Sequence, residues 1–339
     1  MQICPNCFKD AELKAFVSAS TILGDCAICK STNQSIMDIM ELMDFFQELI
    51  DNFKPVKDGN SIKNKIQKSW AFFSNNDVAE KILNHVLKKI DTDIQDANSI
   101  VDYIAEITNN YGYWEILKKE LKWSHRFLSN LEQLLDLGWD GFFNTQYRLS
   151  PDTSLYRARV HHQSGNQAYS RDEMFTPKQH LAKGGRANPL GIPYLYLSDN
   201  RETVLYEVRA SYLDELSIAT FQLKAEYDSV NIVDFTENTA LFRPEKVRET
   251  ITAKLLREKV SRDLSKPMRR YDSEIEYIPT QYICEFIRII TGALGIRYDS
   301  SLHPSGKNVV IFDQKIMECT KVDLHRVTTI NLNSKELSV

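Results

Sequence analysis

The sequence predicts a multidomain protein in which a zinc knuckle and an α-helical bundle precede an α+β domain. Three observations lead to this prediction: two CxxC motifs near the N-terminus, helical periodicity from residue 35 to about 140, and short β-type runs beyond it. We therefore expect a Cys4 zinc knuckle over residues 1–34, a helical domain over 35–147 and an α+β domain over 148–339.

Composition narrows the class of protein. The chain has 339 residues, with 42 Lys and Arg against 46 Asp and Glu, and 42% of its residues are hydrophobic. This balance is typical of a folded globular protein and disfavours disorder, collagen-like structure and a highly basic nucleic-acid coat. No stretch approaches the ~18–20 consecutive apolar residues of a membrane span, and the N-terminus lacks a signal-peptide pattern. We expect a soluble cytoplasmic protein with reduced thiols.

The first element is defined by cysteines. Cys4 and Cys7 form one CxxC motif, Cys26 and Cys29 form another, and 18 residues separate the two. This spacing is typical of a structural zinc site, because each pair can turn two thiolates toward one ion. A closed Cys4 site leaves no vacancy for water or substrate, so we expect a structural role. Free buried cysteines are the alternative.

Helical spacing of apolar residues follows the cysteines. Residues 35–38 can cap a first helix, and the pattern predicts helical segments at 36–50, 62–73, 78–90, 94–107 and 114–137. We interpret the aromatic and methionine stripes as packed core rather than as a ligand surface.

The second half of the chain mixes strands and helices irregularly, which favours an α+β domain over a doubly wound sheet. We expect strands at 155–160, 194–197, 218–223, 230–234, 309–312 and 321–328, and helices near 202–213, 244–261 and 279–291.

Three segments of this half carry more polar residues than a plain core needs. Arg157 and Arg159 alternate onto one face of a predicted strand, where two guanidinium groups can grip phosphate, although a strand arginine is more often an exposed edge residue. A glycine-rich loop at 184–191 leads through a strand to a helix carrying Glu207, at the rim of its apolar face. That carboxylate is either a solvated boundary residue or a functional acid. The third segment, 295–301, ends in two serines and by itself indicates only a turn.

In this order the three segments resemble the RES domain, a family named for an arginine, a glutamate and a serine. The matching stretches are LYRAR, then GGRANPLGIPYLYLSDNRETVLYEVR, then YIPTQYICEFIR running into GIRYDSS and NVVIF, over approximately residues 153–313. The resemblance assigns the catalytic residues to Arg157, Glu207 and Ser300, with Ser301 as an adjacent candidate. It assigns further substrate-binding positions to Arg186 and Tyr196. The N-terminal half resembles the zinc-knuckled region before some RES domains that is grouped with HEPN-type helical domains.

The resemblance implies a fold similar to ADP-ribosyltransferases and an enzyme that destroys NAD by hydrolysis or phosphorolysis at the nicotinamide–ribose bond. It also implies a bacterial toxin or defence effector held by an antitoxin. We expect Glu207 to stabilise the ribosyl cation, Arg157 with Arg186 to hold the diphosphate, Tyr196 to contact nicotinamide or ribose, and Ser300 to position the nicotinamide end or the acceptor. This mechanism needs no metal. Assembly into a homo-oligomer would use the helical domain.

Three alternatives remain at this stage. A macromolecule could accept the ADP-ribosyl group in place of water or phosphate. A HEPN-type ribonuclease needs Arg-x(4–6)-His on a helix, and Arg157 with His162 and Arg297 with His303 satisfy the spacing outside the helical half, so we interpret them as coincidence. A non-catalytic binding protein is the third alternative, but the near-neutral charge and a pI near 6.0 do not favour nucleic acid as its partner.

Overall fold

The structure, a computed structural model, describes residues 1–128, 131–144, 146–267 and 274–331. Contacts divide the chain into two compact units, Met1–Trp114 with Asn238–Leu256 and Glu115–Glu237 with Arg257–Val339. The division falls inside two long helices, α5 (Ala105–Trp123) and α9 (Val247–Ser265). These units are defined by contacts within the structure, whereas the boundaries predicted at residues 34 and 147 would separate segments that fold independently. Those boundaries stay predictions.

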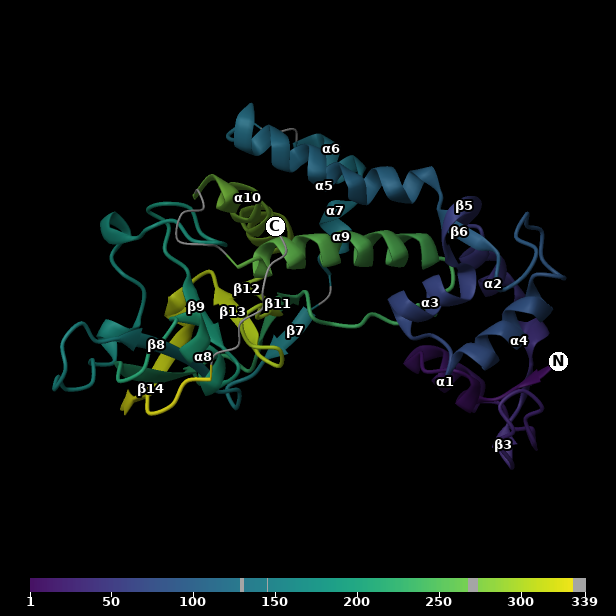
Figure 1. Cartoon of the computed structure of the whole chain (residues 1–339), viewed down its shortest axis with the longest axis horizontal. Helices are drawn as coiled ribbons and strands as arrows, with labels where there is room; N and C mark the ends of the chain where they lie inside the picture. Colours follow the sequence, from purple (N-terminus) through teal and green to yellow (C-terminus); the bar gives the residue numbers. More distant parts are fainter. Residues whose placement is uncertain (129–130, 145, 268–273, 332–339) are drawn as a thin grey trace. The chain divides into compact units, whose positions relative to one another are not determined.

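The first unit mixes helices with short strand pairs (Figure 1). Its helices are α1 (Ala11–Ser18), α2 (Met43–Ile50), α3 (Ile62–Trp70) and α4 (Asn76–Val86), together with the first part of α5 and of α9. Its strands pair as β1 (Gln2–Ile3) with β4 (Met37–Asp38), β2 (Leu23–Gly24) with β3 (Gln34–Ser35), and β5 (Phe53–Ser61) with β6 (Ile100–Tyr103).

The helical prediction for this region is therefore only partly right. Segment 94–107 was expected to be helical, but it contains β6, because Val101 and its neighbours pair with β5. The predicted cap at 35–38 also acts differently. Asp38 accepts a hydrogen bond from the Met40 backbone N–H at 3.0 Å and so caps a 3-10 turn, Ile39–Leu42, while the α-helix begins at Met43.

Buried aromatic rings fill the core of this unit. Phe45 packs edge-on against Phe46 and stacks with Phe72, and Phe242 from the returning chain packs against Phe45. Asp10 connects the returning chain to α1. One oxygen of its carboxylate caps α1 at the Leu13 N–H, and the other accepts the backbone N–H groups of residues 241 and 242.

The second unit contains a mixed eight-stranded sheet with helices, which confirms the predicted α+β class. Its strand order is β14-β10-β8-β9-β13-β12-β11-β7, and neighbours are antiparallel except β11 with β12. The strands are β7 (Gln146–Leu149), β8 (Leu155–Val160), β9 (Leu195–Ser198), β10 (Glu215–Leu223), β11 (Val230–Asp234), β12 (Gly295–Asp299), β13 (Lys307–Ile311) and β14 (Met317–Arg326). The helices are α6 (Leu131–Asp136), α7 (Trp139–Phe142), α8 (Arg201–Glu207) and α10 (Ile278–Phe286), with the second part of α5 and of α9. Strands β7 and β12 were not predicted.

The join between β8 and β9 positions the site. These strands pair through one residue pair in register, Tyr156 with Ser198. Helix α8 lies next to β8 (Figure 1). Val204 of α8 is buried in a cluster with Ala158 of β8 and Ile218 of β10. Apolar packing thus fixes the helix that carries Glu207 beside the point where β8 and β9 are joined by a single residue pair.

Within the described residues, no helix is long and apolar enough to cross a membrane.

Candidate active site

A cavity of about 330 Å³ lies where β8, β9 and α8 meet. It is lined by Tyr156, Arg157, Ala158, Gly185, Arg186, Tyr196, Leu197, Ser198, Val204, Glu207, Val208, Tyr298 and Asn308. Four of the residues selected from the sequence are in this lining, and a fifth, Ser300, contacts it by a hydrogen bond to Glu207. Ser301 is exposed and is not among the lining residues.

Glu207 is the last residue of α8 and is partly buried. Its Oε1 accepts a hydrogen bond from Ser300 Oγ at 2.7 Å and another from Asn308 Nδ2 at 2.7 Å. Among the described residues, no donor is recorded at its Oε2. One oxygen therefore fixes the orientation of the carboxylate, and the other is available to a ligand in the cavity.

Asn308 is a residue of the candidate site that the sequence pattern did not single out. It lies on β13, is 8% exposed, and pairs in register with Tyr298 of β12 and Ser198 of β9. Because it opens the apolar run NVVIF, the pattern predicts core strand. A polar amide inside such a run was the available signal, since a buried amide needs hydrogen-bonding partners.

The Arg157 side chain extends from β8 and has few hydrogen-bond acceptors around it. Its Nη1 donates to the Tyr196 carbonyl at 3.4 Å, and its Nε is buried with no partner. Burial, and secondly the like charge of Arg159, lower the pKa of Arg157 to about 10. A buried cation with so little compensation is costly, so an anionic ligand in this cavity would be strongly favoured.

Arg159 does not join Arg157 at the cavity. Its Nη2 donates to the Phe175 carbonyl at 2.7 Å, and it is not a lining residue. The strand therefore supplies one guanidinium group to the cavity, not the pair that the alternation indicated.

The glycine-rich loop forms one wall. Tyr196 Oη accepts from the Ala187 backbone N–H at 2.9 Å and donates to Asn188 Oδ1 at 2.8 Å. Burial raises the pKa of the Tyr196 hydroxyl well above its ordinary value, so it stays protonated as a donor. At Gly185 a Cβ atom would lie 2.7 Å from that hydroxyl, so the loop approaches too closely for a side chain. Arg186 Nη1 donates to the Leu264 carbonyl at 2.7 Å.

The two arginine–histidine pairs with ribonuclease-like spacing lie outside α-helices. Arg157 is on β8 and His162 follows that strand, while Arg297 is on β12 and His303 lies in the next turn. Arg297 is neutralised by Asp234, with Nη1 to Oδ2 at 2.9 Å.

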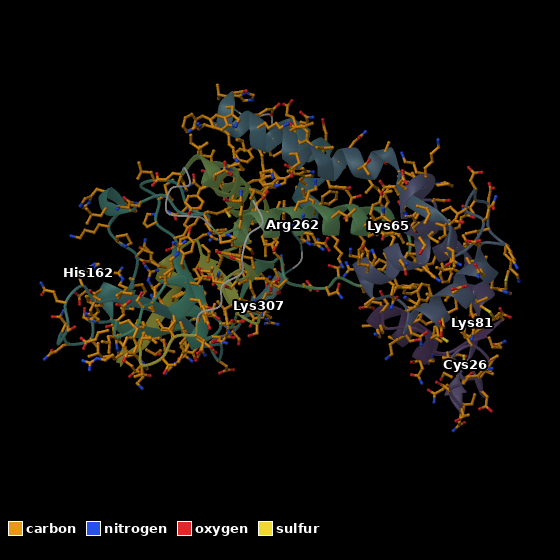
Figure 2. All side chains as sticks on the ribbon, in the orientation of Figure 1. Cys26, Lys65, Lys81, His162, Arg262 and Lys307 are labelled. Atoms are coloured by element: carbon orange, nitrogen blue, oxygen red, sulfur yellow. The ribbon has the colours of Figure 1, made fainter. Side chains whose placement is uncertain are left out.

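A separate cluster in the first unit brings the four N-terminal cysteines together. Cys26 lies in the purple N-terminal part of the chain (Figure 2). The four Sγ atoms lie within 4.8 Å of one another, and Cys4 is 3.3 Å from Cys29 and 4.0 Å from Cys7. Such a group of cysteines could hold a metal ion. Burial raises the pKa of Cys4 to about 12, so a cation would be needed to hold its thiolate form.

The sequence model of the RES domain family matches residues 154–331, which is more than half of the chain. The chain belongs to the RES domain family. Among solved structures, it is similar to a chain in the crystal structure of the MbcT–MbcA toxin–antitoxin complex of M. tuberculosis. The identity is 14% and the TM-score 0.30, and the match covers 56% of this chain and 89% of that one. No curated protein matches the sequence.

Proposed function

We propose that this RES domain protein is an enzyme that cleaves the nicotinamide–ribose bond of NAD. The observation that carries the proposal is a single cavity lined by both the partly buried Arg157 side chain and the Glu207 side chain. NAD presents both complementary charges, an anionic diphosphate and a ribosyl carbon that becomes cationic as the bond breaks. The family resemblance assigns the same two residues to catalysis.

The chemistry requires little from the protein beyond electrostatics. The C–N bond breaks with its electron pair going to nicotinamide, which leaves as a neutral ring, so a general acid is dispensable. Glu207 would stabilise the oxocarbenium-like sugar through Oε2, with Ser300 and Asn308 holding Oε1. Water then forms the new C–O bond and releases a proton, giving ADP-ribose; phosphate as acceptor gives ADP-ribose 1″-phosphate.

The cations would act on the other end of the substrate. Arg157 lines the cavity and would donate to the diphosphate, and Arg186 would assist from the loop. The Tyr196 hydroxyl is used by the loop, so we propose that its ring face, rather than its hydroxyl, contacts the nicotinamide or ribose. Fold similarity to ADP-ribosyltransferases belongs to the same proposal.

The test is nicotinamide release from NAD by the full chain, with and without inorganic phosphate. Glu207→Gln keeps an oxygen that can accept hydrogen bonds from Ser300 and Asn308 but removes the charge, so its kcat should be lower by about 10²–10³. The kcat of Glu207→Ala should be at least as low. Glu318→Gln, on an exposed position of β14, is the matched control. An unchanged rate in Glu207→Gln removes the carboxylate from the mechanism. Mass spectrometry separates ADP-ribose or its phosphate from a modified macromolecule.

We also propose that the cysteine cluster holds a structural zinc ion. At Zn–S bonds of about 2.3 Å, tetrahedral sulfurs lie about 3.8 Å apart, and the recorded separations of 3.3, 3.5 and 4.0 Å bracket this value. The ion would stabilise the N-terminal fold and take no part in NAD cleavage. A toxin role with an antitoxin partner and a HEPN-like helical region follow from the family resemblance and stay predictions. The cytoplasmic location, which was expected from composition, also stays a prediction.

A further inference from the structure

The turn that carries Ser300 is a seven-residue hairpin loop, residues 300–306, between β12 and β13; Lys307, labelled in Figure 2, begins β13. The Ser300 backbone N–H donates to the Gly306 carbonyl at 2.9 Å, and the Gly306 N–H donates to the His303 carbonyl at 3.0 Å. Hairpin loops are commonly two to five residues long. A longer loop relies on contacts outside the hairpin to fix its position.

The imidazole of His303 supplies such a contact to α8. Its Nδ1 lies 2.8 Å from Thr203 Oγ1, and its ring lies parallel to the Tyr206 ring, with centroids 5.1 Å apart and planes 10° apart. Its Nε2 is 3.8 Å from a carboxylate oxygen of Glu202, and the His303 side chain is 12% exposed. We call Thr203, Tyr206 and His303 the His303 latch.

The latch is one helical turn from the catalytic carboxylate. Thr203 and Glu207 are four residues apart, and therefore lie on the same face of α8. The turn lies close against this helix at Thr203 as well, because a Cβ atom on Gly306 would be 2.1 Å from Thr203 Oγ1. The Ser300 turn thus meets α8 at two places, the latch and the Ser300–Glu207 hydrogen bond.

The latch and Ser300 are also joined through the backbone. Ser300 Oγ accepts from the His303 N–H at 3.3 Å and from the Leu302 N–H at 3.2 Å, and it donates to Glu207 Oε1 at 2.7 Å. Those two amides direct the hydroxyl proton of Ser300 toward Glu207. Fixing the His303 ring therefore fixes one of the groups that orients Ser300.

We propose that His303 is a positioning residue for NAD cleavage, acting through Ser300 on the orientation of the Glu207 carboxylate. The inference rests on the proposed function. A threonine hydroxyl can both donate and accept, so the Thr203–His303 hydrogen bond forms with either neutral tautomer of the ring and with the imidazolium. The latch accordingly depends on the hydroxyl and on the shape of the ring.

The experiment compares two pairs of variants in the full chain, with nicotinamide release as the assay. Thr203→Val removes the hydroxyl at similar volume and Thr203→Ser keeps it; His303→Phe keeps a stacking ring without a hydrogen bond, and His303→Asn keeps a polar atom near the Nδ1 position. We expect kcat to fall about ten- to a hundredfold in Thr203→Val and His303→Phe, with KM changed less than about threefold. Thr203→Ser and His303→Asn should recover most of the rate.

A double-mutant cycle separates positioning from general destabilisation. If the latch acts through Ser300, Thr203→Val should cause no further loss in a Ser300→Ala background. The same fold-loss in both backgrounds, or full activity in Thr203→Val, overturns the inference while leaving the proposed function intact.

Hydrogen exchange gives a second readout that does not depend on NAD. The Leu302 and His303 amides should exchange at least about threefold faster in Thr203→Val than in Thr203→Ser. If the unmodified chain releases no nicotinamide, the proposed function fails, and exchange then decides the latch alone: equal rates in the two variants overturn it.

Discussion

Replacing Arg157 by methionine should stabilise the folded protein while weakening its hold on a diphosphate. Burial lowers the pKa of Arg157 to about 10, and its Nε has no partner. Because one pKa unit corresponds to about 1.4 kcal/mol, this depression disfavours the charged side chain in the folded state by about 3 kcal/mol. Methionine fills similar space without the charge, so we expect a gain of about 1–3 kcal/mol after the weak hydrogen bond to Tyr196 is lost.

Thermal unfolding measures this gain directly. For a unit of roughly 200 residues, a gain of 1–3 kcal/mol raises the midpoint by about 2–12 °C. ADP-ribose, which retains the diphosphate, should reverse the order, because at about 1,000 times its Kd a ligand adds about 4.1 kcal/mol to the unmodified protein alone. Arg159→Met is the control. This substitution removes the 2.7 Å hydrogen bond from Arg159 to the Phe175 carbonyl, so the variant protein should be less stable than the unmodified one. If Arg157→Met unfolds at or below the midpoint of the unmodified protein, the guanidinium is not strained by burial and the reasoning is wrong.

Two further predictions concern the loop and the cysteines. Tyr196→Phe leaves the Ala187 N–H and Asn188 Oδ1 without their partner and should cost about 1–3 kcal/mol in unfolding experiments; a midpoint unchanged within error would mean that the hydroxyl does not brace the loop. Elemental analysis of a Cys4→Ser, Cys7→Ser variant should show about one zinc ion per chain fewer than the unmodified protein, and zinc should also be lost as the pH falls, because protons compete for the thiolates. Equal zinc content in both proteins would exclude these ligands.

The strands next to the site were predictable because their patterns are local. The limits of β8 at Leu155 and Val160 were expected, and β11 was expected at 230–234. Strand β12 was missed because Arg297 and Asp299 interrupt its apolar residues, and the partner of Arg297, Asp234, is 63 residues away along the chain. Segment 94–107 shows the opposite error, since its helical spacing is overridden by the pairing of β6 with β5.

Four of the site residues predicted from the sequence lie together in the structure. Arg157, Arg186, Tyr196 and Glu207 line one cavity. Their hydrogen bonds could not be derived from spacing. Asn308 is 101 residues from Glu207 along the chain, and the two side chains meet only because α8 packs against the sheet that contains β13.

The single residue pair between β8 and β9 means that buried side chains, such as Leu155 of β8 and Leu197 of β9 in one core cluster, contribute much of the contact between these strands. Beside this point Val204 of α8 packs on Ala158 of β8 and Ile218 of β10, and it also lines the cavity. If the proposed function holds, structural integrity and turnover share the same few aliphatic positions. A genetic selection for inactive variants should recover substitutions at Val204 and Ile218 as often as changes to the charged residues, even though neither aliphatic side chain takes part in bond breaking.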